Sequence, residues 1–468
     1  MAWGSTARLR SASPPPWAPL VLRWSSPVLA HRRRRVGLLV ALVASGLLSA
    51  ALPVVATGLA LLACGAACLA VVGAAPLATG LVALLPWLII FLEPVPDELR
   101  TMVAALGAGF AFLAVLSRRR PSGWLFGASL LLVPAFLSLP TASGAGAFQF
   151  LRYLAFVALV GLLVSERGSD LAGRMTRVAL PSACAALLVH AAVVTLGLGS
   201  TGTYYGFGER LGYASSPHDL AFFAAGAGIA AFLRFDRATL RYGFFALAAT
   251  ITLLTGVRSA MAGLILFAAL LAFRRGARMQ QLAVVLAATA AVWATGTNQV
   301  LTERLLKSEQ SGEFSQISSA GSGRGEIWSN AIVSWQDAGP VAWLFGTGLR
   351  SLPGLSQKAF GTPFTGHSDL IEIGVQLGLV GLAGYLVLVV LVIRAASTKL
   401  VLTVLGAAAV LNGALEYIAP LTLILVFAGA KAAPLASRAT GPARGRSPAR
   451  TRSTTGSSVL AIARAPEG

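Results

Sequence analysis

The stretch LAVVLAATAAVWATG, residues 282–296, is apolar on every side of the helix that it would form. Similar uncharged segments of about 15 to 25 residues recur along the chain, and each is long enough to cross some 30 Å of hydrocarbon as a helix. A membrane β-barrel would instead need short segments of alternating polarity. The mean hydropathy of +0.76 and the 12% of charged residues also lie outside the range of soluble domains. We therefore expect an all-α, polytopic integral membrane protein.

The hydropathy pattern predicts about 12–14 transmembrane helices. Pro53 alone separates the first two candidates, and only the turn near Glu416 separates the last two, so each pair could form one helix. The candidate spans are residues 36–51, 54–74, 77–92, 101–117, 122–139, 149–165, 178–198, 219–233, 242–256, 260–273, 280–296, 369–393, 400–415 and 417–430.

Polar, basic segments flank this helical region. Residues 1–35 are rich in Arg, Ser and Pro and are predicted to form a disordered cytoplasmic arm, and residues 431–468 a similar basic tail. The transmembrane domain between them, residues 36–430, contains one long hydrophilic loop at 297–368. This loop is too long for a plain connection and too short for a core of its own, so we expect a lid or a docking platform.

Charged residues divide unevenly between the two sides of the predicted topology. With the N-terminus inside, 28 of the 37 Lys and Arg fall on inner segments, whereas 13 of the 17 Asp and Glu fall on outer segments. Lys and Arg favour the cytoplasmic side of a membrane, so both termini are expected in the cytoplasm and the long loop outside. The net charge of +20 follows from this topology and indicates contact with anionic membrane lipids rather than nucleic-acid binding.

The long loop contains one helical pattern, GSGRGEIWSNAIVSWQDAG, at residues 321–339. Two tryptophans on its apolar face fit a short helix that lies in the membrane interface, and a small helix packed on the spans is the alternative. In both cases Arg324 lies at the helix N-terminus, where free backbone N–H groups and a guanidinium can hold an anion. The apolar face consists of Ile327, Trp328, Ala331, Ile332 and Trp335.

Four motifs fall on the predicted outer face, around this loop. They are R-LGYASSP-HD (Arg210–Asp219); T-G-x-R-S (Thr255–Ser259); G-R-x-x-x-W (Gly323–Trp328) with F-G-T-G (345–348); and G-H-S-D-L-x-x-x-G-x-x-x-G-x-x-G (Gly366–Gly381). In this order they resemble the bacterial O-antigen polymerase and ligase superfamily of membrane glycosyltransferases, over roughly residues 36–430. One departure is His218, where relatives more often carry Asn.

The resemblance implies a GT-C-like glycosyltransferase of the bacterial cytoplasmic (inner) membrane that builds cell-surface polysaccharide. Its donor would be a glycan on a polyprenyl (undecaprenyl) diphosphate, and its acceptor a hydroxyl of a glycan, lipid or protein at the outer face. No D-x-D or other convincing carboxylate cluster is apparent on that face, so we expect no metal and no cofactor. Arginine can neutralise the departing diphosphate instead, because its planar fork binds phosphate oxygens in pairs.

Arg258, Arg210 and Arg324 are the candidate diphosphate ligands. Arg258 lies between two apolar spans, where a lipid-facing arginine costs about 2.5–3.5 kcal/mol, so we expect it to face a polar cavity. A side chain that extends to the outer headgroups is the alternative. Arg210 and Arg324 lie in loops, where ordinary surface arginines are common.

His367 is the candidate general base that removes the proton of the acceptor hydroxyl. Histidine titrates near neutral pH, and the N-terminus of the following span, capped by Ser368 or Asp369, would keep its imidazole neutral. The alternative is an interfacial histidine bound to a loop carbonyl. His218, Asp369 and Glu416 are weaker, supporting candidates.

Two other functions fit the same spans. A secondary transporter or flippase would share the architecture, but transporters commonly place ionisable residues and broken helices near the midplane, whereas here such residues gather at span ends. A peptidoglycan-type polymerase is the third possibility.

Overall fold

The computed structural model describes residues 72–91, 97–116, 122–142, 144–196, 201–203, 209–211, 217–273, 324–360 and 366–431. The predicted spans at 36–51 and 280–296, almost all of 54–74, the arm at 1–35 and residues 432–468 of the tail lie outside the described residues.

The described helices follow the predicted apolar segments, and five of them are long and apolar enough to cross a membrane. Those five are α5 (Asp97–Val115), α7 (Gly144–Val164), α8 (Gly168–Thr195), α10 (Ala238–Thr255) and α17 (Asp369–Ala395). The other apolar helices are α4 (Ala74–Phe91), α6 (Ser122–Leu137), α9 (Pro217–Arg234), α11 (Arg258–Phe273), α18 (Leu402–Leu411) and α19 (Ile418–Gly429), with short 3-10 turns at η2 (Leu139–Thr141), η6 (Lys399–Val401) and η7 (Ala414–Tyr417).

Helices α18 and α19 are shorter than the spans predicted at 400–415 and 417–430. They contain 10 and 12 residues, which corresponds to about 15–18 Å of helix against some 30 Å of hydrocarbon. Asn412, Gly413 and η7 separate them. Gly413 has φ of +76°, a left-handed conformation with which the chain leaves the helical path between α18 and α19.

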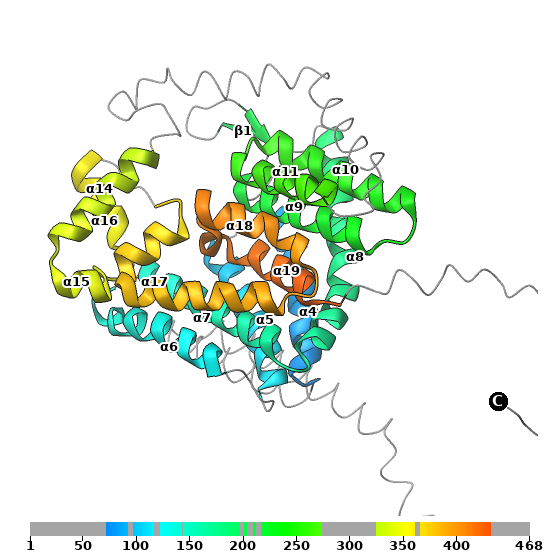
Figure 1. Ribbon diagram of the computed structural model, residues 1–468. Helices are drawn as coiled ribbons and strands as arrows, with labels where there is room; N and C mark the ends of the chain where they lie inside the picture. Colours follow the sequence, from blue (N-terminus) through cyan, green and yellow to red (C-terminus); the bar gives the residue numbers. More distant parts are fainter. Residues whose placement is uncertain are drawn as a thin grey trace, which may run out of the picture. The chain divides into compact units, whose positions relative to one another are not determined.

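Helix α19 forms the centre of the bundle (Figure 1). All of its residues are buried, and it contacts α4, α5, α7, α8, α9 and α18. A helix that is apolar on every side is expected in such a position. Small residues let the neighbours approach closely: a Cβ on Gly226 of α9 would lie 2.6 Å from Cγ1 of Ile424.

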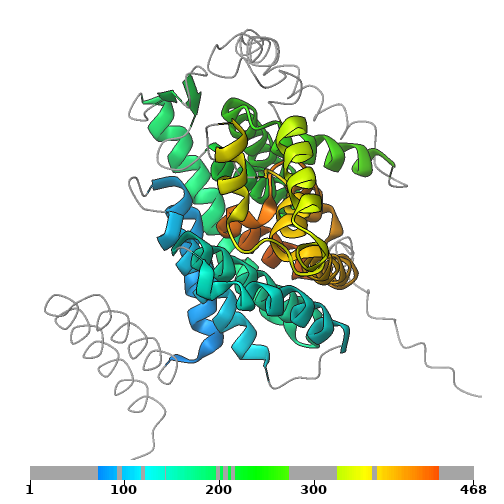
Figure 2. The same ribbon diagram turned by 90° about the vertical axis from the view of Figure 1, so that its left-hand side faces the viewer.

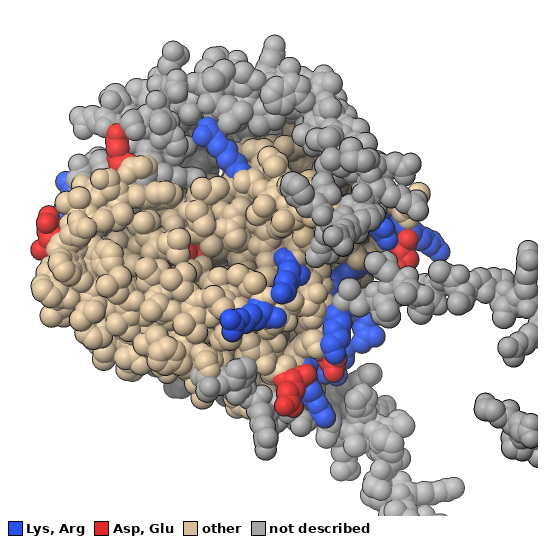
Figure 3. Space-filling view, viewed as in Figure 1, with Lys and Arg blue, Asp and Glu red and all other residues tan. Residues whose placement is uncertain are grey.

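The outer surface of the bundle is apolar. Phe126, Phe136, Leu137 and Ile265 expose between 60% and 70% of their surface. Figure 3 shows a broad face with few charged side chains, most of them toward its margins. Exposed apolar area of this extent fits a lipid environment. The chain is therefore an all-α, multi-pass membrane protein, as the composition predicts.

Segments that are predicted to lie on the cytoplasmic side meet at one end of the bundle. Arg234, at the end of α9, donates to the carbonyl oxygens of Phe427 and Ala430 at 2.9 and 2.6 Å. Lys431 forms an ion pair with Asp170 at 3.6 Å. The contacts join the start of α8 to the ends of α9 and α19.

The second half of the long loop forms α14 (Arg324–Asp337), α15 (Pro340–Phe345) and α16 (Ser351–Phe360). Figures 1 and 2 both show α14 and α16 beside the first half of α17, and both helices contact it. Ile327 and Ala331 are buried, and Ala331 packs with Leu352 of α16 and Val375 of α17. The apolar face of α14 therefore packs on protein, as the alternative predicts, and its place relative to the membrane interface stays a prediction.

Candidate active site

Helix α17 begins two residues after His367. The half-buried His367 has φ of +47°, a left-handed conformation that is uncommon for a residue with a side chain. Ser368 occupies the N-cap position, but its side chain makes no capping hydrogen bond. Asp369 is the first helical residue. His367 thus lies at a helix N-terminus, as predicted, although the predicted side-chain cap is absent.

Gly366 is bound to two helices. Its N–H group donates to Oε1 of Glu372 at 3.3 Å, and its carbonyl oxygen accepts the indole N–H of Trp328 at 2.6 Å. A Cβ at this position would lie 2.8 Å from Cγ of Glu372, so only glycine fits without displacing that side chain. The G-R-x-x-x-W and G-H-S-D motifs are therefore in direct contact.

Asp369 links the start of α17 to the turn between α18 and α19. Its carboxylate, 1% exposed, accepts the Tyr385 hydroxyl at 2.8 Å and the backbone N–H of Leu415 at 3.1 Å. A Cβ on Gly413 would lie 3.6 Å from Oδ1 of Asp369 and 3.7 Å from Oε2 of Glu416. Two predicted supporting residues, Asp369 and Glu416, are therefore neighbours.

His218, the second residue of α9, packs against the same turn. Its ring stacks on Tyr417, with the ring centroids 5.5 Å apart and the planes at 19°. The adjacent Asp219 accepts a hydrogen bond from Arg100 of α5 at 3.0 Å, in an ion pair that is only about a tenth exposed. The R-LGYASSP-HD motif thus ends against η7, next to the Glu416 that flanks Asp369.

The F-G-T-G motif binds a break in α17. Gly378 has φ of +69° and ψ of −170°, so the helix is interrupted there. Thr347 and Gly348 donate their backbone N–H groups to the carbonyl oxygens of Val375 and Gln376, at 2.9 and 3.0 Å. The loop replaces helical bonds that the break removes. Gly378 therefore allows close packing of α17 against the backbone of Leu344 and Phe345.

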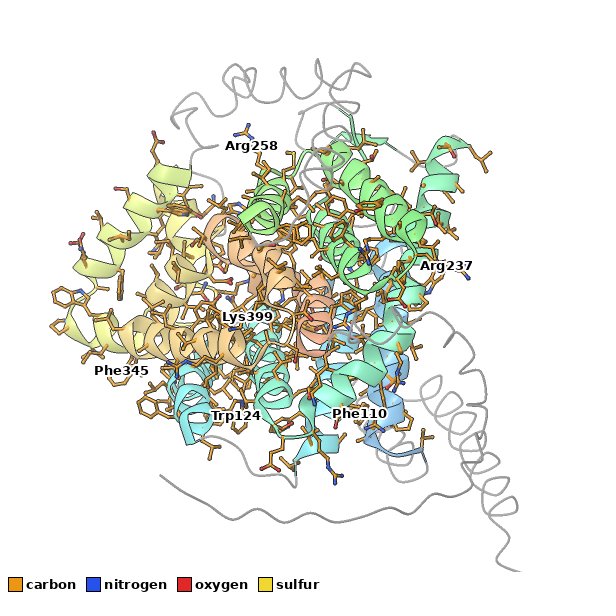
Figure 4. The ribbon with its side chains drawn as sticks, turned by 45° about the vertical axis from the view of Figure 1, so that its right-hand side comes forward. Phe110, Trp124, Arg237, Arg258, Phe345 and Lys399 are labelled. Atoms are coloured by element: carbon orange, nitrogen blue, oxygen red, sulfur yellow. The ribbon has the colours of Figure 1, made fainter. Side chains whose placement is uncertain are left out.

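The three candidate diphosphate ligands lie in three different elements. Arg258 begins α11, and its exposed side chain is at one margin of the molecule and points away from the helices (Figure 4). Arg210 lies in β2 (Glu209–Leu211), which pairs with β1 (Thr201–Thr203) and contacts α10. Arg324 begins α14. The side chains of Arg210 and Arg324 lie outside the described residues, so a common binding site for the three arginines stays a prediction.

Glu372 is a further buried residue of this site that none of the four motifs indicated as functional. It is 3% exposed, and both Arg152 of α7 and Arg350 are close enough for their charges to attract its carboxylate. Two signals were available in the sequence: the spacing of Asp369 and Glu372 on one side of a helix N-terminus, and Arg152 within an apolar span.

These contacts define a polytopic membrane protein with a buried polar site where the long loop meets α17. Residues 243–386 match the family model described as O-Antigen ligase. Over these residues the chain is similar to the O-antigen ligase family, in agreement with the resemblance seen in the motifs. The match includes Arg258, Arg324, His367 and Asp369. The search of curated proteins found no match.

Proposed function

We propose that the protein is a membrane glycosyltransferase that takes a glycan from a polyprenyl-diphosphate donor and attaches it to an acceptor hydroxyl at the outer face of the membrane. The family match supports an O-antigen ligase-like function in polysaccharide biosynthesis. The lipid-diphosphate donor, the independence from metal, the bacterial inner membrane and the cytoplasmic termini belong to the proposal.

The observation that carries the proposal is the convergence of separate motifs at the start of α17. Trp328 reaches the residue before His367, and Leu415 donates to Asp369 two residues after it. His218 stacks on Tyr417, next to Glu416. Residues that are more than a hundred positions apart therefore surround one histidine-containing turn.

The chemistry follows from these positions. His367 accepts the proton of the acceptor hydroxyl as its oxygen attacks the anomeric carbon of the donor glycan. The new glycosidic bond forms as the bond from the anomeric carbon to the diphosphate oxygen breaks, and the lipid diphosphate leaves with the electron pair. Arg258, with Arg210 and Arg324, neutralises its charge, because guanidinium groups bind phosphate oxygens strongly.

A turnover assay tests this proposal. Purified protein is given a polyprenyl-diphosphate glycan and an acceptor, and product is measured for wild type and for His367→Ala. A general base contributes about 10²- to 10⁴-fold, and we expect kcat to fall by that factor. His31→Ala, in the predicted basic arm, is the matched control and should retain full activity. Unchanged turnover by His367→Ala would remove this histidine from the mechanism.

The break in α17 favours a second candidate function, a transporter or flippase of a lipid-linked or small substrate. Broken helices with buried ionisable residues form the substrate sites of many transporters, and α17 carries Asp369 and Glu372 on one side of its break at Gly378. The loop, however, already binds the carbonyl oxygens that the break releases. Movement of substrate across vesicles without any glycan product would favour transport.

A further inference from the structure

The turn that carries His367 is held by contacts to the residue before it. Gly366 donates its N–H to Glu372 of α17 and accepts the indole N–H of Trp328 of α14. A residue other than glycine adopts a left-handed conformation at a cost, and it persists where surrounding contacts impose it. The two hydrogen bonds to Gly366 are contacts of this kind, one at its N–H group and one at its carbonyl oxygen.

We propose that Glu372 is a positioning residue of the transfer reaction. Its carboxylate fixes the N–H group of Gly366, the residue before His367, and thereby helps to set the place of the imidazole; Trp328 provides the second tether, at the carbonyl oxygen of the same residue. This inference rests on the proposed function, since it gives Glu372 a role through the general base.

Burial and charge explain why a carboxylate holds this position. Glu372 is 3% exposed, and a buried carboxylate needs hydrogen bonds and opposite charge around it. Arg152 of α7 and Arg350 attract it from two other segments. The carboxylate also accepts the backbone N–H of Gly366, so Glu372 lies where α17, the loop and the His367 turn meet.

The geometry also limits which side chains can replace Glu372. Its Cγ lies 2.8 Å from the point where a Cβ of Gly366 would be, so the side chain is directly against the turn. Aspartate would withdraw the carboxylate by about 1.5 Å, the length of one carbon–carbon bond. Glutamine keeps the length and the accepting oxygen and loses only the charge.

Turnover of conservative variants is the first measurement. A misplacement of about 1 Å can cost 10²-fold in rate, so we expect kcat to fall by up to about 10²-fold in Glu372→Asp and Trp328→Phe and by about 10-fold in Glu372→Gln. The substrate KM should change little. Glu98→Gln, which alters an exposed carboxylate of α5, is the matched control and should keep full activity.

A double-mutant cycle separates positioning from a general structural role. If Glu372 acts through His367, Glu372→Gln should cause no further loss in a His367→Ala background, because the group that it positions is gone. A second 10-fold loss in that background would overturn the proposal. Equal kcat in wild type and in all three tether variants, each monodisperse in detergent, would overturn it as well.

A labelling experiment tests whether Glu372 positions residue 367, and it does not depend on the transfer reaction. His367→Cys is made in a chain whose Cys64, Cys68 and Cys184 are alanine, and the rate of reaction with a membrane-impermeant maleimide is measured. Adding Glu372→Gln should change this rate several-fold, and adding Glu98→Gln should not. An unchanged rate would overturn the tether. Absence of product from wild type would instead overturn the proposed function, because the labelling rates still report on the turn.

Discussion

Substitution of Gly378 by alanine should destabilise the protein through the break in α17. With φ of +69° and ψ of −170°, the residue occupies a backbone region that is essentially restricted to glycine, which costs about 1–3 kcal/mol for alanine. The new Cβ would also overlap the backbone carbon and oxygen of Leu344, so the loop must move. This movement would break the backbone hydrogen bonds that Thr347 and Gly348 donate to α17, each of which contributes about 0.5–1.5 kcal/mol. We expect a total loss of about 2–6 kcal/mol.

The free energy of unfolding, measured by denaturant titration in mixed micelles, checks this value. Gly80→Ala in α4 is the matched control, because nothing lies within 4 Å of the added Cβ there. That change should be neutral or stabilise the helix by about 0.5–1 kcal/mol. If Gly378→Ala unfolds at the same denaturant concentration as Gly80→Ala, the close packing of the loop against the break in α17 does not contribute to stability.

Four further outcomes are expected. Arg258→Lys should lower kcat/KM by about 10-fold or more, because an ammonium cannot bind two phosphate oxygens as a planar fork does; Arg237→Lys, on a predicted cytoplasmic segment, should not. Removal of either partner of the buried pair between Arg100 and Asp219 should cost about 3–5 kcal/mol of unfolding free energy. Replacement of both residues by apolar ones should recover most of that loss. A single substitution that costs no unfolding free energy would contradict the burial of the pair. A chelator should leave turnover unchanged, and a loss that Mg²⁺ restores would show a metal-dependent reaction. A cysteine at Ser311 should react with an impermeant reagent added outside intact cells, and protection there would reverse the predicted topology.

The amino-acid sequence determined the class of protein and most of its helices. Apolar segments of membrane length depend only on local composition, so α5, α7, α8 and α17 were predictable from the chain itself. The motifs around His367 were visible for the same reason, since each spans fewer than twenty residues. A turn between α18 and α19 was predicted near Glu416, but the exact ends of the two helices were not, because hydropathy does not reveal the left-handed conformation of Gly413.

Tertiary structure decided which motifs touch. The bonds from Trp328 to Gly366 and from Leu415 to Asp369 join segments 38 and 46 residues apart, and no periodicity within either segment encodes them. The face of α14 illustrates the same limit: its two tryptophans suit a membrane interface or a protein contact equally well, and only the presence of α16 and α17 beside it selects the second. Glu372 gained its role in the same way, because a carboxylate near a helix start acquires a partner only when the fold brings the backbone of Gly366 within 3.3 Å.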